Sequence, residues 1–90
     1  MVNVQLPSQF SALIAGQKNL SIHASTLVEV FQKLDEIAPM IRSQIFDTTG
    51  SIRQFVGMFI DERQVNNLRE EVHTLRNGCQ ILIVISVAGG

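Results

Sequence analysis

The chain opens with an alternation of apolar and polar side chains, Val2, Asn3, Val4, Gln5 and Leu6. A period of two is typical of a half-buried strand, because successive side chains of a strand point to opposite faces. Pro7 has no N–H to donate to a neighbouring strand, so we expect the strand to end there. A second short strand is predicted over 19–23, and the connection over 9–16 makes the two a hairpin with a long turn.

An amphipathic helix is the clearest predicted element. Thr26-Leu27-Val28-Glu29 has the capping-box pattern, in which the Thr26 hydroxyl accepts from the N–H of Glu29 and the Glu29 side chain reaches back. Pro39 predicts the end of this helix, and residues 40–46 are expected to add a short helical piece. Apolar residues follow the cap at helical spacing and form one stripe, Leu27, Val30, Phe31, Leu34, Ile37 and Ala38.

The C-terminal half is predicted to contain three strands. Residues 53–60 form the third strand, Asp61-Glu62-Arg63 the turn after it, and Val65 lies in a short edge strand before a helical turn. Asn77-Gly78 marks the last turn. The segment 79–87 is almost continuously apolar, which is typical of a strand buried on both faces in the middle of a sheet, with the first strand as its neighbour.

This order of elements predicts an α+β fold in two layers. One main helix packs on one face of a mixed sheet of four to five strands, which describes a ubiquitin-like β-grasp. The length fits a single domain, and we expect the domain over 1–87 and a flexible Ala-Gly-Gly tail over 88–90.

Composition narrows the function classes. The chain has 90 residues, with 7 basic and 8 acidic side chains and a net charge of -1. Without an excess of basic residues, we do not expect it to bind the phosphates of nucleic acid. A hydrophobic content of 46% and a mean hydropathy of +0.22 argue against disorder. The longest apolar run, 81–85, is far short of the roughly 20 residues of a membrane helix. No secretory signal is recognisable, so no membrane association and a cytoplasmic location are expected.

No catalytic constellation is visible in the sequence. His23 and His73 lack a metal-ligand spacing, and we interpret them as ordinary surface residues with no metal site. Cys79 is the only cysteine, so it forms no intrachain disulfide, and we interpret it as a small core or edge residue. The glycines are scattered and form no phosphate-binding loop. We therefore expect the protein not to be an enzyme.

The last two residues, Gly89 and Gly90, are the strongest candidate for chemistry. Glycines have no Cβ, so a terminal carboxylate on such a tail can thread a narrow channel in a partner. Extended from Val87, the tail would reach about 10 Å. We expect Gly90 to be modified, with Gly89 and Ala88 allowing its entry. The alternative is a frayed end without function, or a cloning remnant.

A second candidate is an apolar surface on the sheet. If Ile81, Ile83, Ile85 and Val87 face the helix, their neighbours point to the opposite face, which a two-layer fold leaves uncovered. Four apolar side chains would then form a partner-binding patch, Phe55, Phe59, Leu82 and Val84. Two alternatives stay open: the segment 40–51 folds over this patch, or the chain self-associates.

Taken together, these features resemble the ubiquitin-like sulfur-carrier family (the MoaD/ThiS group). That family includes the small subunit of molybdopterin synthase, the thiamine sulfur carrier and the carrier of a cysteine-synthesis pathway. The long middle segment and the Ala-Gly-Gly end are most similar to the cysteine-type carriers. The resemblance covers nearly the whole chain, and the segments that carry it are 2–7, Gly16-Gln17-Lys18, Thr26-Leu27, Phe55-Val56, Leu75-Arg76-Asn77-Gly78 and Val87-Ala88-Gly89-Gly90.

The resemblance implies a carrier that is itself the substrate of other enzymes. An E1-like adenylyltransferase would adenylate Gly90 with ATP, which the partner consumes and this chain does not bind. A sulfurtransferase of rhodanese type would supply sulfur, leaving a C-terminal thiocarboxylate. An acceptor enzyme would receive the sulfur for cysteine or homocysteine, molybdopterin, thiamine or another thio-metabolite.

Three departures from the family pattern leave the pathway and the partner enzyme open. The family's Asp-Gly-Asp turn is Asn77-Gly78-Cys79 here, the last strand lacks its usual proline over 85–87, and Gly57 stands where an asparagine is frequent. Two other functions remain as alternatives. One is a non-covalent ubiquitin-like interaction module, and the other is the small subunit of a sulfur-transferring enzyme complex.

Overall fold

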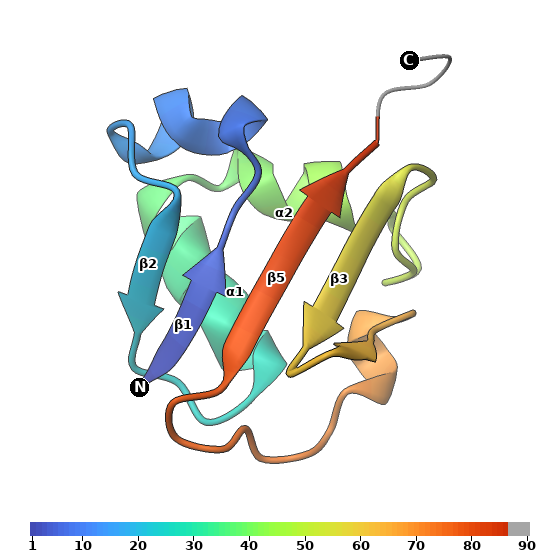
Figure 1. The fold of residues 1–90 in the computed structure, drawn as a ribbon. Helices are drawn as coiled ribbons and strands as arrows, with labels where there is room; N and C mark the ends of the chain where they lie inside the picture. Colours follow the sequence, from blue (N-terminus) through green and yellow to red (C-terminus); the bar gives the residue numbers. More distant parts are fainter. Residues whose placement is uncertain (87–90) are drawn as a thin grey trace.

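A mixed sheet forms one layer of the molecule, and two α-helices form the other (Figure 1). The structure is a computed structural model that describes residues 1–86. Within this range the strands are β1 (Val2–Gln5), β2 (Asn19–Ile22), β3 (Val56–Ile60), β4 (Arg63–Gln64) and β5 (Gln80–Ile85). The helices are α1 (Leu27–Ile37), α2 (Met40–Ile45) and the short 3₁₀ helices η1 (Ser8–Ile14) and η2 (Leu68–Glu70).

The strands lie in the order β2-β1-β5-β3-β4, so β5 occupies the centre of the sheet. It runs parallel to β1, with Val4 opposite Ile81, and antiparallel to β3, with Met58 opposite Ile83. As predicted, the last strand of the chain, β5, is central, and the first strand, β1, is its neighbour. The fold is a ubiquitin-like β-grasp, which confirms the predicted fold class.

Helix α1 begins with the predicted cap. The N–H of Glu29 donates to the Thr26 hydroxyl at 3.2 Å. The Glu29 carboxylate accepts from the N–H of Ser25 at 3.1 Å, one residue before the expected position. The apolar stripe packs beneath the sheet, except that Ile37 is 52% exposed, contrary to prediction. Ile37 is the last residue of the helix and lies furthest from the centre of the stripe.

Helix α2 packs on the same side of the sheet as α1 (Figure 1). Ile41 and Ile45 are fully buried. The ring of Phe46 meets that of Phe31 edge to face, with 5.0 Å between centroids. The segment after α1 therefore extends the core on the helical side and does not fold over the opposite face, so that alternative is wrong.

Several predicted boundaries are also wrong. Strand β3 begins at Val56 and not at 53, because the N–H of Val56 donates to the carbonyl of Arg53 and closes a turn. The short edge strand lies at Arg63–Gln64, and Val65 after it is buried. Most of the predicted connection over 9–16 lies in η1.

None of the described helices is long and apolar enough to cross a membrane.

Strand β5 is not buried on both faces, as its apolar run had predicted. Its burial alternates, with Ile81 and Ile83 in the core and Leu82 and Val84 exposed. The reason is architectural. Both α-helices lie against one face of the sheet, and within residues 1–86 no helix covers the other face (Figure 1).

The cap of α1 allows a direct test of helix stability. Thr26→Ala removes the acceptor for the N–H of Glu29, and we expect the free energy of unfolding to fall by about 1 kcal/mol. For a domain of this size, this lowers the melting temperature by roughly 4–8 °C. Urea unfolding followed by circular dichroism measures the change. Thr74→Ala, at an exposed threonine, is the control and should leave stability unchanged; an equal loss in both variants would refute the capping role.

Candidate functional site

Three of the four predicted apolar side chains, those of Phe59, Leu82 and Val84, lie on the open face of the sheet, and exposed Phe55 directly precedes β3. Leu82 on β5 lies opposite Phe59 on β3, and Val84 lies opposite Gly57 two residues further on. Phe55, Leu82 and Val84 are 49%, 36% and 39% exposed, and Phe59 is half-buried. We call the surface formed by Phe55, Phe59, Leu82 and Val84 the open-face patch.

Gly57 shapes the middle of this patch. A Cβ on Gly57 would lie 3.1 Å from Cγ2 of Val84 and 3.4 Å from Cε2 of Phe59. The side chains of Phe59 and Val84 therefore both lie against the glycine, and a Cβ at this position would be tight against Val84 and in contact with the Phe59 ring. Compared with a polar residue such as asparagine, glycine at this position keeps this part of the surface apolar.

Phe55 marks the end of the patch where the chain continues toward residues 87–90. Its carbonyl accepts from the N–H of Ser86 at 2.8 Å, which fixes the last described residue after β5. Its backbone has a φ of +68°, a left-handed conformation that costs a bulky residue of the order of 1 kcal/mol. The hydrogen bond to Ser86 thus places half-exposed Phe55 next to the last described residue of the chain, in spite of its unfavourable backbone conformation.

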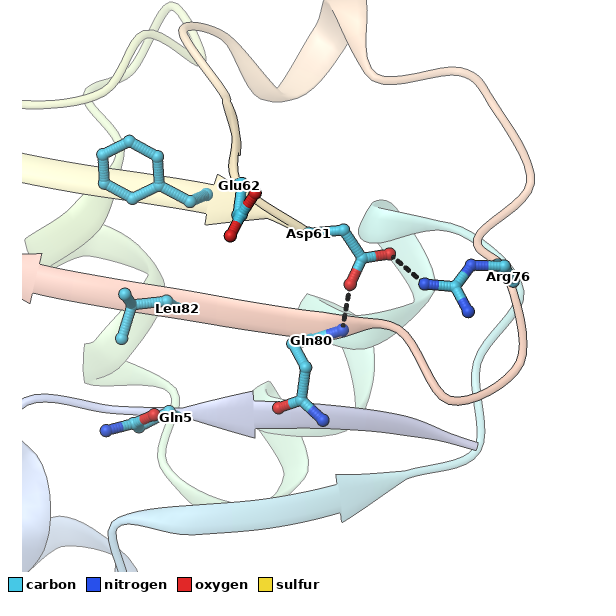
Figure 2. Close-up of a pocket in the computed structure, with 7 residues that line it drawn as sticks. Gln5, Asp61, Glu62, Arg76, Gln80 and Leu82 are labelled. Carbon is cyan, nitrogen blue, oxygen red and sulfur yellow. Dashed lines mark hydrogen bonds and ion pairs between the residues drawn. The ribbon is translucent and has the colours of Figure 1, made fainter.

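A shallow pocket with a polar rim lies at the other end of the open face (Figure 2). Phe59 and Leu82 contribute apolar side chains, while Gln5 and Gln80 line it from β1 and β5. Its polar rim is completed by Asp61, Glu62 and Arg76. The open face therefore offers a partner an apolar centre and hydrogen-bonding groups at one end.

Asp61 ties the turn after β3 to the start of β5. Its carboxylate accepts from the backbone N–H of Gln80 at 2.9 Å and from the Arg76 guanidinium at 2.8 Å (Figure 2). The hydrogen bonds from Gln80 and then from Arg76 hold the pKa of this carboxyl below its ordinary value of 3.8. The turn at Asp61 is predicted by the sequence but this link is not, since nothing in the spacing of Asp61 and Arg76 indicates that they meet.

The described residues offer few groups for catalysis. Cys79 is buried, and burial, followed by the charge of Asp61, raises the pKa of its thiol, so the thiol stays protonated at neutral pH. This agrees with its interpretation as a core residue. His23 and His73 are exposed, and no group of three or more potential metal ligands occurs within residues 1–86.

The tail residues predicted to carry the chemistry, Ala88, Gly89 and Gly90, lie outside the described residues. The same is true of Val87, which was predicted to face the helix. The structure describes the strand that leads to them and the surface beside their origin. The roles of the tail and of the open-face patch stay predictions.

No protein-family model matches the chain, and no curated protein matches it in sequence. Solved structures do match. A chain of the complex of BexX and CysO from Amycolatopsis orientalis superposes with a TM-score of 0.82 at 19% identity, covering 100% of both chains. CysO from Mycobacterium tuberculosis gives 0.80 at 23% identity, over 97% of this chain and 100% of its own.

The small archaeal modifier protein 1 from Methanosarcina acetivorans is also similar, with a TM-score of 0.67 at 22% identity. The alignment covers 99% of this chain and 95% of the modifier. The resemblance predicted from the sequence is therefore confirmed as a likeness of structure that extends over the whole chain. The protein is a ubiquitin-like β-grasp protein, similar in fold to CysO and to the small archaeal modifiers.

The Asp61 link predicts a specific pH dependence. Because the pKa of Asp61 is lower in the folded state, its contribution to stability is fully present above the unfolded pKa, near 3.8, and is lost as the pH falls through the folded pKa. We expect Asp61→Asn to be less stable than the parent protein at neutral pH, and the difference to shrink in acid. Urea unfolding at a series of pH values measures both effects. A difference that is independent of pH would show that the charge of Asp61 contributes nothing.

Proposed function

We propose that this protein is a sulfur carrier whose Gly90 carboxylate is activated and converted to a thiocarboxylate. The main support is its likeness over the full chain to CysO, a cysteine sulfur carrier, in a sequence that has a Gly-Gly dipeptide after β5. The proposal makes the chain a substrate and carrier of sulfur, on which partner enzymes act.

The chemistry follows from the low reactivity of a carboxylate. One carboxylate oxygen of Gly90 attacks the α-phosphorus of ATP and pyrophosphate leaves, giving a mixed anhydride with AMP. Hydrosulfide then attacks the acyl carbon and AMP departs with the electron pair of the broken C–O bond. If the donor is a sulfurtransferase persulfide, an acyl disulfide forms first, and a thiol releases the thiocarboxylate by exchange.

The partners supply every catalytic group in this scheme. An E1-like adenylyltransferase would bind ATP, a sulfurtransferase would supply sulfur, and an acceptor biosynthetic enzyme would receive it. The complex of BexX with CysO is a precedent for a protein of this fold in complex with another protein. We propose that the open-face patch contacts the adenylyltransferase, because Phe55 lies where the tail begins and the patch is exposed.

Intact-mass measurement tests the proposal. The chain ending at Gly90 is incubated with MgATP, sulfide and each E1-like enzyme encoded in its source genome. We expect a mass increase that corresponds to exchange of one oxygen for sulfur, and no increase without ATP. Deleting Gly90 should abolish the increase without changing the melting temperature, since the domain core lies within residues 1–86. Failure with every such enzyme would exclude the proposed function.

Leu82→Asp tests the role of the open-face patch in the same reaction. A carboxylate placed in a desolvated apolar contact is unfavourable, so we expect the modification to slow by roughly tenfold or more. Val72→Asp is the matched control, because Val72 is 74% exposed and lies outside the patch. Equal rates for the two variants would remove the patch from the reaction.

The open-face patch also favours a second candidate, a non-covalent ubiquitin-like interaction module. The two functions differ in their dependence on the tail. If the chain acts as an interaction module, deleting Gly89 and Gly90 leaves partner binding intact and Leu82→Asp destroys it. A small subunit of a sulfur-transferring complex needs the tail as well, and it would elute with its large subunit as a stoichiometric complex on a sizing column.

A further inference from the structure

A second recess lies outside the open face, between α2, the loop that follows it and η2. Its volume is about 560 Å³, within the usual range for small-molecule sites. It shares no lining residue with the open-face patch or with the shallow pocket of Figure 2. It is therefore a site separate from the surface described above.

Arginines dominate the charge of this recess. The chain has 7 basic residues and a net charge of -1, yet Arg42, Arg53 and Arg69 all line this one site. The carboxylates of Asp35 and Asp47 line it too. Because three positive charges meet two negative ones, the site has an excess of positive charge on a protein that is slightly acidic overall.

The two carboxylates are already engaged. Asp35 pairs with Nη2 of Arg42 at 3.0 Å. Oδ1 of Asp47 accepts from the hydroxyl and the N–H of Thr49 and from the N–H of Ser51. The Thr49 hydroxyl is the main cause that lowers the pKa of Asp47, so this carboxylate stays ionised and held within its own loop.

The remaining donors belong to Arg53 and Arg69. Nε of Arg53 donates to the carbonyl of Ser43 at 2.6 Å, which anchors the side chain, while its terminal nitrogens have no hydrogen-bond partner within residues 1–86. Nη2 of Arg69 makes only a long contact of 3.5 Å to the carbonyl of Thr48. Nε of Arg42 is buried and also lacks a partner in this part of the chain. The site thus presents guanidinium donors that the fold itself does not use.

The recess also has an apolar wall. Phe46 and Leu68, both almost fully buried, line it beside the arginines. Planar guanidinium groups bind phosphate and carboxylate oxygens through paired hydrogen bonds. Apolar atoms next to them favour a ligand with an organic body over a bare ion.

We propose that this recess binds a small organic anion. Its phosphate or carboxylate group is held by Arg53 and Arg69, with Arg42 nearby, and its apolar part lies against Phe46 and Leu68. The inference does not depend on sulfur transfer, because it involves neither the tail nor the open-face patch.

NMR titration of the full chain tests this site. Phenyl phosphate, inorganic phosphate and benzoate are added to ¹⁵N-labelled protein at constant ionic strength, set with chloride. We expect saturable shifts of the Nε–H signals of Arg53 and Arg69 and of the backbone amides over 48–51. Tighter binding of phenyl phosphate than of inorganic phosphate supports the apolar wall. The comparison of phenyl phosphate with benzoate identifies the preferred oxyanion.

Charge-neutralising variants distinguish the site from general attraction. Arg69→Gln loses a hydrogen bond to a charged group, and we expect the dissociation constant to rise roughly ten- to a hundredfold. Arg53→Gln should act in the same way, provided that its melting temperature shows an intact fold. Lys33→Gln removes the same charge from the exposed face of α1 and should have no effect. Linear, non-saturating shifts, or equal weakening by Lys33→Gln and Arg69→Gln, would overturn the proposal.

The tail gives a separate control. The chain lacking Gly90 should bind phenyl phosphate as the full chain does, even though the sulfur-carrier proposal expects it to lose the modification. A loss of anion binding in this variant would contradict the independence of the recess. Failure of the titration with the full chain would leave the sulfur-carrier proposal unaffected.

Discussion

The parallel pairing of β1 with β5 is the interaction on which the rest of the structure depends. It joins the two ends of the chain at the centre of the sheet, with Val4 opposite Ile81. Two further backbone hydrogen bonds join the same segments. The N–H of Asn3 donates to the carbonyl of Cys79, and the N–H of Gly78 donates to the carbonyl of Met1. Strand β5 is paired with β1 over residues 80–82 and with β3 over residues 81–85, so it lies between two strands and presents the side chains of its uncovered face to a partner.

The uncovered face follows from where the helices lie. Both α1 and α2 pack on one side, and they bury Ile81 and Ile83 from the central strand. The alternate residues, Leu82 and Val84, point to the opposite face of the sheet, and they are exposed although both are apolar. Gly57 adds to this effect, since the side chains of Phe59 and Val84 both pack close to the position that its Cβ would take. The apolar character of the surface is thus a direct consequence of a sheet with only one helical layer.

Local patterns predicted the elements that depend on local physics. The capping box at Thr26 and the alternation of β1 both correspond to observed structure, because each signal lies within a few residues. The apolar run of β5 correctly predicted a central strand but wrongly predicted burial on both faces. A run of apolar residues does not reveal how many layers cover a sheet. The Asp61–Arg76 link and the cluster of arginines around α2 could not be predicted either, since both join segments that are far apart in sequence and show no motif.

The closure of the sheet by β5 has a consequence for recognition. The open-face patch combines side chains from the β3 and β5 segments, and the antiparallel pairing of these two strands brings Phe59 opposite Leu82. The surface therefore exists only where β3 and β5 are paired, and a protein that recognises it reads the folded sheet and not a linear sequence motif.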